Sequence, residues 1–545
     1  MRFKGRIVSA FMVLAAVVTM IPGCGAQTAD DTKQNSGNSS SVSSTSQLNA
    51  TGLPIVNEPV TLKIMVRKQD VQPEFEKMLA FQEYEKLSGV KIEWDNLNSS
   101  NAGDKVKLAF ASQDLPDAFM KLSISNIDQL NFGSQGLLLN LNELIDEYAP
   151  NVKKFMDEHP DVKKSQTFDN GAIYSLPAGV ESSAVRLARK YYINKEWLKK
   201  VGMEMPASTD ELYNVLKAFK ENDANGNGKA DEIPLASDTL QNIMDVLRGA
   251  FGIGNRGMLQ QSIDMDEITG KIRYIQTSEQ YKQFLQYLNK LYKEGLMDQE
   301  IFTIKQPQFI AKASEGLIGS FSAPNTATIP SQHVGEFEGL PAALKGPGGD
   351  QMWAALRPYT TGTGAFVITS ANKYPEITMR WVDYFYGDDG IKLFNLGVEG
   401  KSYVKTADGK YDWSDEVYSG VNSTTPFDAV VSKYAPYVGG SNPTIIREPY
   451  FGGREMEEVS YKASMNLIPF APKEVWPDFT FTVKENERLT VLRTDIDGYV
   501  TKMMSEFITG HTSFSEWNSY VDQINKMGLE EMLGIYTTAY ERYKK

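Results

Sequence analysis

The sequence predicts an α/β protein that is built on a parallel sheet and has two domains. Alternating apolar residues mark strands over 60–66 and 90–94, and a helical pattern with a proline near its start lies between them, over 73–87. A short helix over 104–112 and a strand over 118–120 follow. This β-α-β-α-β order favours parallel strands with right-handed crossovers. About 490 residues follow the N-terminal segments, which is more than one hydrophobic core usually supports.

Later segments continue the mixture of helices and strands. A hydrophobic content of 41% and an aromatic content of 11% are typical of a globular chain. Two stretches, 172–177 and 185–193, are expected to be extended and to lead into a second unit. The remaining expected elements are helices over 209–222 and 278–294, a strand over 363–369, a helix over 375–386, and a tail over 495–543 that is helical in three pieces.

The N-terminus has the pattern of an export signal. Arg2, Lys4 and Arg6 precede an uncharged apolar run over 7–21, which is too short for a comfortable membrane span. Cys24, the only cysteine, closes this segment. Residues 21–24, IPGC, resemble the bacterial lipobox. The resemblance implies that residues 1–23 are a signal peptide and that Cys24 carries a lipid anchor, with at least two acyl chains for stable attachment. The alternative is a buried free cysteine.

The region after Cys24 is expected to be a flexible linker. Residues 24–57 are rich in serine and contain few large apolar residues, so this stretch buries too little surface to fold. The formal net charge of the chain is −13. That charge argues against nucleic acid as a partner and against general adhesion to anionic lipid. Contact with the membrane is therefore expected only through the anchor.

The segment DANGNGKADE, residues 223–232, has the spacing of a calcium loop. Its oxygen-bearing residues alternate as in an EF-hand, and Gly228 stands at the turn position. Pro234 occupies the place of the usual bidentate glutamate, so Glu232 is the expected substitute. The alternative is a solvated Asn/Gly turn after a helix. The expected ligands of a structural Ca²⁺ are Asp223, Asn225, Asn227, the carbonyl oxygen of Lys229, Asp231 and Glu232.

Catalysis has little support in the sequence. The three histidines, His159, His333 and His511, lie far apart and lack metal-ligand spacing. No nucleophile-elbow or phosphate-loop motif is present. Paired carboxylates could serve a glycosidase, but a chain with 69 acidic residues always offers some suggestive pair. We therefore expect no catalytic residues.

Several aromatic and basic residues are candidates for a saccharide site. Tyr174, Trp353 and Trp476 stand in turn-rich or Gly/Pro-rich contexts that favour loops at a cleft, although packing in the core is an equal alternative. Arg186 is a candidate for binding an acidic sugar, with surface solvation or ion pairing as the alternative. The carboxyl ends of the first strands place Arg67 and Lys121 at the candidate rim, where ligands of such sheets bind.

The chain resembles the family 1 extracellular solute-binding lipoproteins of bacterial ABC sugar importers. It looks most like LipO-type lipoproteins and is similar to alginate-oligosaccharide-binding proteins. The similarity spans roughly residues 60–540. The segments that show the similarity are ASQDLPDAF (111–119), NGAIYSLP (170–177), NKEWLKKVGMEMPASTDELYNVLKAFKENDANGNGKADEIPL (194–235), LYKEGLMDQE (291–300) and RWVDYFYGDDGIKLFNLGVEGKSY (380–403).

The resemblance implies two α/β lobes, a hinge and a ligand cleft between the lobes. We expect an N-lobe of 58–180 plus 362–425 and a C-lobe of 181–361 plus 426–545. The calcium ligands carry over onto the loop residues given above, and Tyr174 is the one sugar contact that carries over. The expected partners are an oligosaccharide and the permease subunits of an importer. The protein is expected to be a monomer on the outer face of the cell membrane.

Two other functions remain open at this point. One is an extracellular polysaccharide-degrading enzyme, and the other is a surface lipoprotein with no role in transport. Activity without any added partner would distinguish the first, and the absence of neighbouring permease genes would distinguish the second.

Overall fold

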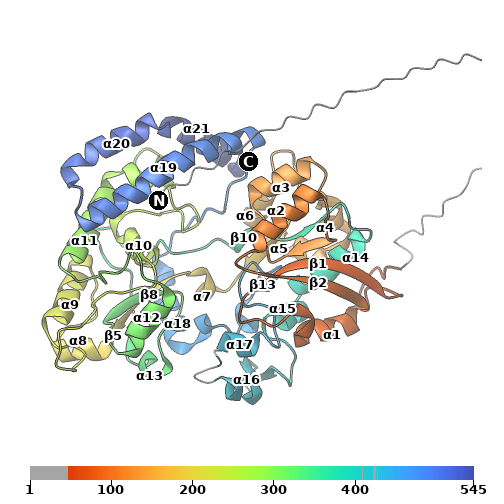
Figure 1. Cartoon of the computed structure of the whole chain (residues 1–545), viewed down its shortest axis with the longest axis horizontal. Helices are drawn as coiled ribbons and strands as arrows, with labels where there is room; N and C mark the ends of the chain where they lie inside the picture. The colour runs from red at the N-terminus through yellow and green to blue at the C-terminus, as the bar shows by residue number, and fades with distance from the viewer. Residues whose placement is uncertain (1–46, 408, 422–424, 426) are drawn as a thin grey trace, which may run out of the picture. The chain divides into compact units, whose positions relative to one another are not determined.

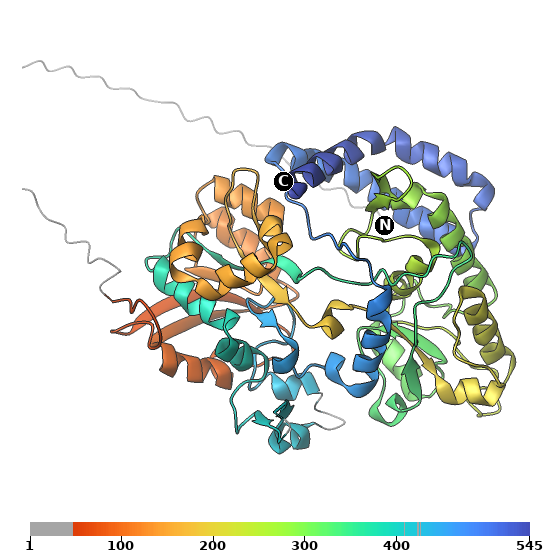
Figure 2. The ribbon, with the colours of Figure 1, turned by 180° about the vertical axis from the view of Figure 1, so that it is seen from behind.

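The computed structural model describes residues 47–407, 409–421, 425 and 427–545. This part of the chain forms two α/β lobes, which Figures 1 and 2 show from opposite sides. The first lobe is built on a six-stranded sheet and the second on a three-stranded sheet with long helices. The predicted α/β class is confirmed.

The six-stranded sheet of the first lobe is mixed rather than wholly parallel. β1 runs parallel to both β2 and β3, as the sequence predicts, but β10 runs antiparallel to β3 and β4. Val60, Leu62, Ile64 and Val66 alternate inward from β1 and are buried. In pairing order the strands are β13 (Ile445–Ile446), β4 (Leu176–Val180), β10 (Thr360–Ile368), β3 (Ala118–Met120), β1 (Val60–Lys68) and β2 (Val90–Asn98).

Helices cover both faces of this sheet. The helix predicted over 73–87 begins later: Phe75–Lys77 form a 3₁₀ turn, and α1 then runs from Leu79 to Ser88. Gly89 ends α1 with φ of 74°, a backbone angle that favours glycine. The other helices of this lobe are α2 (Ala102–Ser112), α3 (Asn126–Ser134), α4 (Asn142–Tyr148), α5 (Pro150–Glu158), α6 (Pro160–Gln166), α14 (Pro375–Asp383), α15 (Asp388–Asn395), α16 (Asp415–Gly420) and α17 (Phe427–Val431), with the ribbon β11 (Tyr403–Lys405) and β12 (Tyr411–Trp413).

The second lobe is predominantly helical. Its sheet has β5 (Lys190–Asn194) between β8 (Ser320–Ala323) and β9 (Phe337–Gly339), all antiparallel. The expected helices over 209–222, 278–294 and the three-part tail are confirmed, although the tail begins earlier, at Val483. The helices are α7 (Ser183–Arg186), α8 (Lys195–Val201), α9 (Thr209–Glu221), α10 (Leu240–Leu247), α11 (Glu279–Lys293), α12 (Gln306–Ser314), α13 (Ser331–Val334), α18 (Glu458–Leu467), α19 (Val483–Thr509), α20 (Trp517–Lys526) and α21 (Leu529–Lys544), and a ribbon joins β6 (Ile263–Asp266) to β7 (Lys271–Tyr274).

Three segments cross between the lobes and are hydrogen-bonded to one another. The amide of Val180 donates to the carbonyl oxygen of Tyr359 over 2.9 Å. The amide of Glu181 donates to the carbonyl oxygen of Ile446 over 2.9 Å. Segments that cross together in this way are where a hinge rotation between lobes is absorbed, because a few residues at the ends of elements take up the change in backbone angles.

The lobe boundaries assigned from the sequence stay a prediction, and two features of the structure bear on them. β13 lies beyond the predicted first-lobe limit of 425, yet it pairs with β4 in the first sheet. Ile55 and Val56 fall within the expected linker but are buried, and Arg380 donates to the carbonyl oxygen of Gly52 over 3.0 Å. The segment 47–57 therefore packs on the first lobe.

The export signal and Cys24 lie outside the described residues. Among the residues that the structure does describe, we find no helix with the length and hydropathy needed to cross a membrane.

Candidate ligand-binding site

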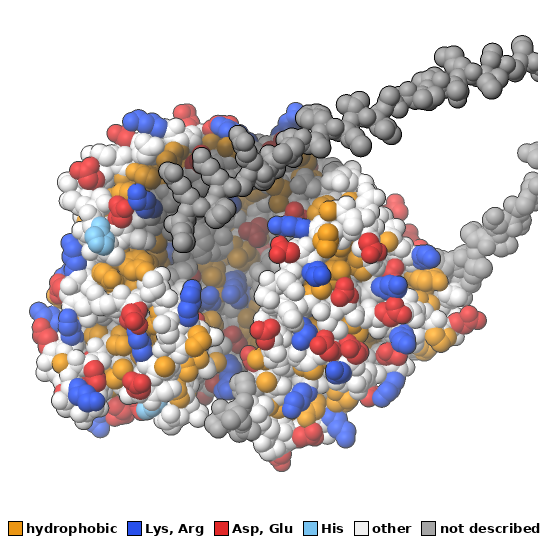
Figure 3. Space-filling model, viewed as in Figure 1, with side chains coloured by type: hydrophobic (Ala, Val, Ile, Leu, Met, Phe, Trp, Pro, Cys, Tyr) orange, Lys and Arg blue, Asp and Glu red, His pale blue; other side chains and the backbone are white. Residues whose placement is uncertain are grey.

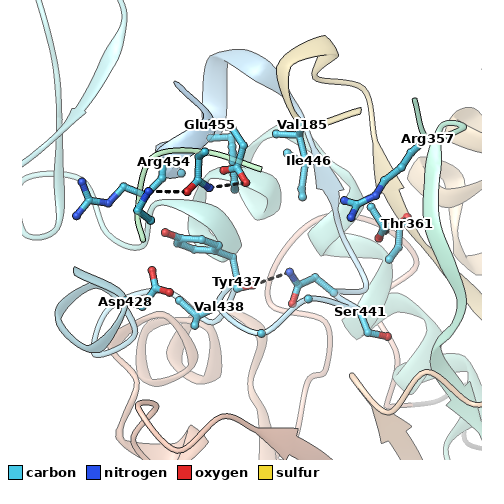
Figure 4. Close-up of a pocket in the computed structure, with 18 of the residues that line it drawn as sticks. Val185, Arg357, Thr361, Asp428, Tyr437, Val438, Ser441, Ile446, Arg454 and Glu455 are labelled. Atoms are coloured by element: carbon cyan, nitrogen blue, oxygen red, sulfur yellow. Dashed lines mark hydrogen bonds between the residues drawn. The ribbon is translucent and has the colours of Figure 1, made fainter. Parts of the chain in front are cut away.

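A cavity of about 750 Å³ lies between the two lobes, in a position where both contribute to its wall. The surface is hollowed between the lobes in Figure 3. The volume falls in the range of small-molecule and cofactor sites, which is about 300–1,000 Å³. Figure 4 shows the wall in close-up. We call this space the main cavity.

The wall of the main cavity comes from short segments that are far apart in the sequence. The first sheet contributes residues at the end of β4 and the start of β10, and the loop 437–442 supplies one side. The second lobe adds residues from the 258–259 loop, α12, the segment after β8, and the stretch before α18. The polar side chains of the wall are Gln306, Asn325, Thr328, Arg357, Thr361, Asp428, Tyr437, Ser441, Asn442, Arg454 and Glu455.

Two charged side chains in the wall lack hydrogen-bond partners. Neither the guanidinium of Arg357 nor the carboxylate of Asp428 makes a side-chain hydrogen bond within the described residues. Burial and the neighbouring charge of Arg189 lower the pKa of Arg357 to about 10, so it stays cationic near neutral pH. Burial raises the pKa of Asp428, and Arg454 offsets part of that rise. These groups are free to bond a polar ligand.

Arg454 and Glu455 are engaged within the wall itself. Arg454 pairs with Glu457, and Glu455 accepts a hydrogen bond from Asn325 over 3.0 Å. In Figure 4 Arg454 and Glu455 lie on one side of the cavity, while Arg357 and Thr361 lie on the other. The wall therefore carries both charge signs, which suits a hydroxyl-rich neutral ligand better than a highly charged one.

Two basic side chains, the buried Lys121 and the partly exposed Arg67, hold the cavity loop in place. Lys121, at 1% exposure, donates from Nζ to the carbonyl oxygens of Pro436 over 2.7 Å and Val438 over 2.9 Å, and also to Asn442 Oδ1. Arg67 donates to the carbonyl oxygen of Gly439 over 2.9 Å. Burial lowers the pKa of Lys121, and the charge of Arg67 lowers it further. Both residues were expected at the rim of the site. In the structure they hold the loop that forms one side of the main cavity.

A cluster of ionic groups stands beside the crossing segments. Glu181 accepts from Arg447 Nε over 2.7 Å and contacts His159 Nε2 at 3.4 Å. Burial raises the pKa of Glu181, but the hydrogen bonds from His159 and Arg447 outweigh it and lower that pKa to about 2. The His159 ring stacks on Tyr359, with 4.1 Å between the ring centroids. His159 is therefore placed to support the hinge.

None of the five residues expected to bind sugar lines the main cavity. Trp353 and Trp476 are 1% and 0% exposed, so their rings offer no free face in this conformation. Tyr174 is buried beside Phe168, and the side chain of Arg186 lies 3.7 Å from the centroid of the Tyr359 ring. Arg67 acts through the loop described above. The structure thus does not bring these residues together, and their role in binding stays a prediction.

Sequence reasoning missed the residues that do line the cavity. Arg357, Thr361 and Asp428 lie in segments without a recognisable motif. The one local signal was the pair Gly439–Gly440, whose φ angles of 93° and 70° both favour glycine. Such a pair marks a tight backbone turn, and here that turn forms part of the wall.

The predicted calcium loop follows α9 and is folded around its own oxygen atoms. Asp223 Oδ1 accepts from the amide of Gly228 over 3.2 Å, and Asn227 Oδ1 accepts from the amide of Lys229 over 2.8 Å. Asn225 donates to Asp231 Oδ1 over 2.8 Å. Hydrogen bonds from Asn225 and Asn227 lower the pKa of Asp231. The loop therefore has several oxygen atoms around one turn.

One observation indicates that the residues of this loop suit a calcium ion. Glu232 Oε1 is buried and has no hydrogen-bond partner in the described part of the chain, which is costly for a carboxylate unless a cation faces it. Within that part of the chain no three His, Cys, Asp or Glu side chains cluster closely enough to hold a metal. Amide and backbone oxygens would therefore have to complete the ligand set, and the amides of Asn225 and Asn227 would have to turn their oxygens inward.

The family of the chain is established by comparison with known proteins. Residues 70–392 match the model of the bacterial extracellular solute-binding protein family, and the chain belongs to that family. It is 30% identical over 505 residues to the fructooligosaccharide ABC transporter substrate-binding protein FusA of Streptococcus pneumoniae, covering 90% of this chain and 91% of FusA. It is 25% identical over 363 residues to the lipoprotein LipO of Bacillus subtilis, covering 63% and 67% of the two chains.

Solved structures show the same two-lobe fold. FusA from S. pneumoniae in complex with kestose matches with a TM-score of 0.73 and 27% identity, covering 89% of this chain and 99% of that one. An EF-hand mutant of FusA in complex with fructo-nystose matches with a TM-score of 0.72 and 26% identity, over the same shares of the two chains. Alginate-binding protein AlgQ2 without calcium ion matches with a TM-score of 0.69, 24% identity, and coverage of 89% and 99%. The family resemblance inferred from the sequence is confirmed.

Proposed function

We propose that the protein captures a neutral oligosaccharide outside the cell and delivers it to an ABC importer, without chemical change to the sugar. The observation that carries this proposal is the main cavity, which both lobes line and in which the side chains of Arg357 and Asp428 have no hydrogen-bond partner among the described residues. A ligand that contacts both lobes favours the closed arrangement, because it binds that state more tightly than the open one. The relationship to FusA points to fructooligosaccharides as the first ligand class to test.

Kestose is expected to bind the wild-type protein, and losing either unpaired charged group should weaken that binding. Hydrogen bonds to charged groups contribute about 1.5–3 kcal/mol, so Arg357→Gln and Asp428→Asn should each reduce affinity about tenfold or more. Titration calorimetry measures this. Lys462→Gln, whose side chain is 62% exposed on α18, is the control and should bind as the wild type does. Absence of kestose binding by the wild type, or unchanged affinity in both cavity variants, contradicts the proposal.

We also propose that the 223–232 loop binds a structural calcium ion. Asp223, Asn225, Asn227, Lys229 through its carbonyl oxygen, Asp231 and Glu232 would hold it, and the ion would neutralise the Glu232 carboxylate, whose Oε1 atom is buried. The EF-hand present in FusA supports this proposal. The ion would stabilise the end of α9 and take no part in ligand chemistry.

Removal of calcium is expected to lower the melting temperature of the wild type. A ligand that binds only the folded state adds RT ln(1 + [L]/Kd) to stability, so calcium in large excess over Kd should add about 2–4 kcal/mol. Differential scanning calorimetry with chelator and with added calcium measures the difference, and Asp223→Ala should erase it. Asp210→Ala, in the first turn of α9 but outside the loop, is the control. Equal melting of the wild type in both conditions contradicts a calcium site.

We further propose that Cys24 anchors the protein to the outer face of the membrane, and that separate permease subunits receive the sugar. The lipoprotein LipO supports the anchor, and FusA, a component of an ABC transporter, supports the importer. The mixed surface charges in Figure 3 agree with attachment through the anchor alone, because that face shows no dominant basic patch.

A further inference from the structure

A second cavity, of about 460 Å³, adjoins the main cavity in the cleft between the lobes. Thr361 and Ser441 line both cavities. The two walls are also continuous along the chain, because Leu259 lines the main cavity and the next residue, Gln260, lines the second. These shared and consecutive residues make the two cavities parts of one groove, with Thr361 and Ser441 where the two cavities meet.

The second cavity, like the first, has walls from both lobes. One wall is the segment 123–127 before and at the start of α3, together with the start of β10. The opposite wall comes from the segment 478–486, from Arg493 on α19 and from Tyr536 on α21. A ligand that enters this space from the main cavity therefore continues to contact both lobes and adds to the preference for the closed arrangement.

The chemistry of the second cavity suits a sugar ring. Phe481 and Tyr536 form an aromatic pair, with 5.6 Å between centroids and an edge-to-face angle of 85°. Aromatic rings offer flat apolar surface, and a tyrosine adds a polar tip. The carboxylate of Asp478 accepts no hydrogen bond within the described residues. Burial raises the pKa of Asp478, and the charge of Arg493 offsets part of that rise. An unpaired carboxylate beside an aromatic pair can accept hydrogen bonds from hydroxyl groups.

We infer that the second cavity binds the distal sugar units of a longer oligosaccharide whose first units occupy the main cavity. The inference rests on the proposed function and adds to it a preference for chain length. Phe481 supplies apolar contact for the distal ring, and Asp478 accepts from its hydroxyl groups. Thr361 and Ser441, where the two cavities meet, lie beside the bond that joins the proximal and distal units.

The test is a length series of fructooligosaccharides measured by titration calorimetry: kestose, nystose and the next longer homologue. Wild type is expected to bind the longest member about fivefold more tightly than kestose, because the added ring gains aromatic contact. Phe481→Leu keeps an apolar side chain but removes the flat ring. This variant should bind kestose within about twofold of wild type and lose most of the gain with length. Asp478→Asn should behave in the same way.

The matched control is Phe302→Leu, the same substitution at a partly buried phenylalanine of the second lobe that lines neither cavity. It should keep the full gain with length. Equal affinity of wild type for all three sugars overturns the inference while the proposed function stands. Equal loss of kestose and of the longer sugars in Phe481→Leu also overturns it, as does loss of the gain in Phe302→Leu. If no member of the series binds wild type, the proposed ligand class fails, and this inference with it.

Discussion

Replacing Lys121 by methionine is expected to lower the free energy of unfolding by about 3–5 kcal/mol and to abolish most sugar binding. The Nζ of Lys121 is the donor to two carbonyl oxygens and one amide oxygen of the segment 436–442, and the side chain is fully enclosed. Methionine has a similar length but no N–H, so three buried acceptors lose their donor. Each unsatisfied buried acceptor costs about 1–3 kcal/mol.

Binding should fall together with stability because the same segment forms a wall of the main cavity. Tyr437, Ser441 and Asn442 all line that cavity, and their positions depend on the loop that Lys121 holds. Urea unfolding followed by circular dichroism gives the stability change, and kestose calorimetry gives the affinity. Lys107→Met on the exposed face of α2 is the matched control and should change neither quantity. A loss of stability below about 1 kcal/mol in Lys121→Met contradicts this assignment.

Local periodicity was sufficient to predict much of the first lobe. Val60, Leu62, Ile64 and Val66 alternate in the sequence because one face of β1 packs into the core, and that face is buried as expected. β13 has only two residues and carries no periodic signal, so its place in the first sheet could not be predicted from the sequence. The antiparallel direction of β10 was missed for a different reason. Its pairing with β3 joins residues about 250 positions apart, and alternation within a strand does not give its direction.

The candidate calcium loop could be recognised in the sequence because its residues are consecutive, whereas the main cavity could not. Arg357 and Asp428 are separated by about 70 residues, and each becomes a candidate only once the two lobes are placed together. Arg186 shows a second limit of prediction from the sequence, which concerns the partner of a side chain. Arg186 was a candidate for binding an acidic sugar, and in the structure its Nε donates to the carbonyl oxygen of Arg357 over 3.1 Å. Backbone acceptors of this kind are invisible in the sequence.

Trp353 provides the sharpest contrast between a context read from the sequence and the environment in the structure. Its Gly/Pro-rich neighbourhood favours an exposed loop, yet its indole N–H donates to the carbonyl oxygen of Arg189 over 3.0 Å and its ring is enclosed. The main-chain amide of the same residue donates to the carbonyl oxygen of Phe470 over 2.8 Å. The loop backbone is thus irregular while the side chain belongs to the core of the second lobe.

Replacing Trp353 by alanine is therefore expected to lower the free energy of unfolding by about 3–5 kcal/mol, with the affinity of the folded protein for kestose within about twofold of wild type. The loss combines the transfer of apolar surface with the cavity left behind, and the freed carbonyl oxygen of Arg189 adds to it. Trp353→Phe should cost less, because it keeps most of the ring volume and loses only the N–H bond. Urea unfolding and kestose calorimetry on all three proteins make the comparison. Unchanged stability together with a tenfold loss of affinity in Trp353→Ala would contradict the core assignment and restore the ring as a stacking surface for sugar.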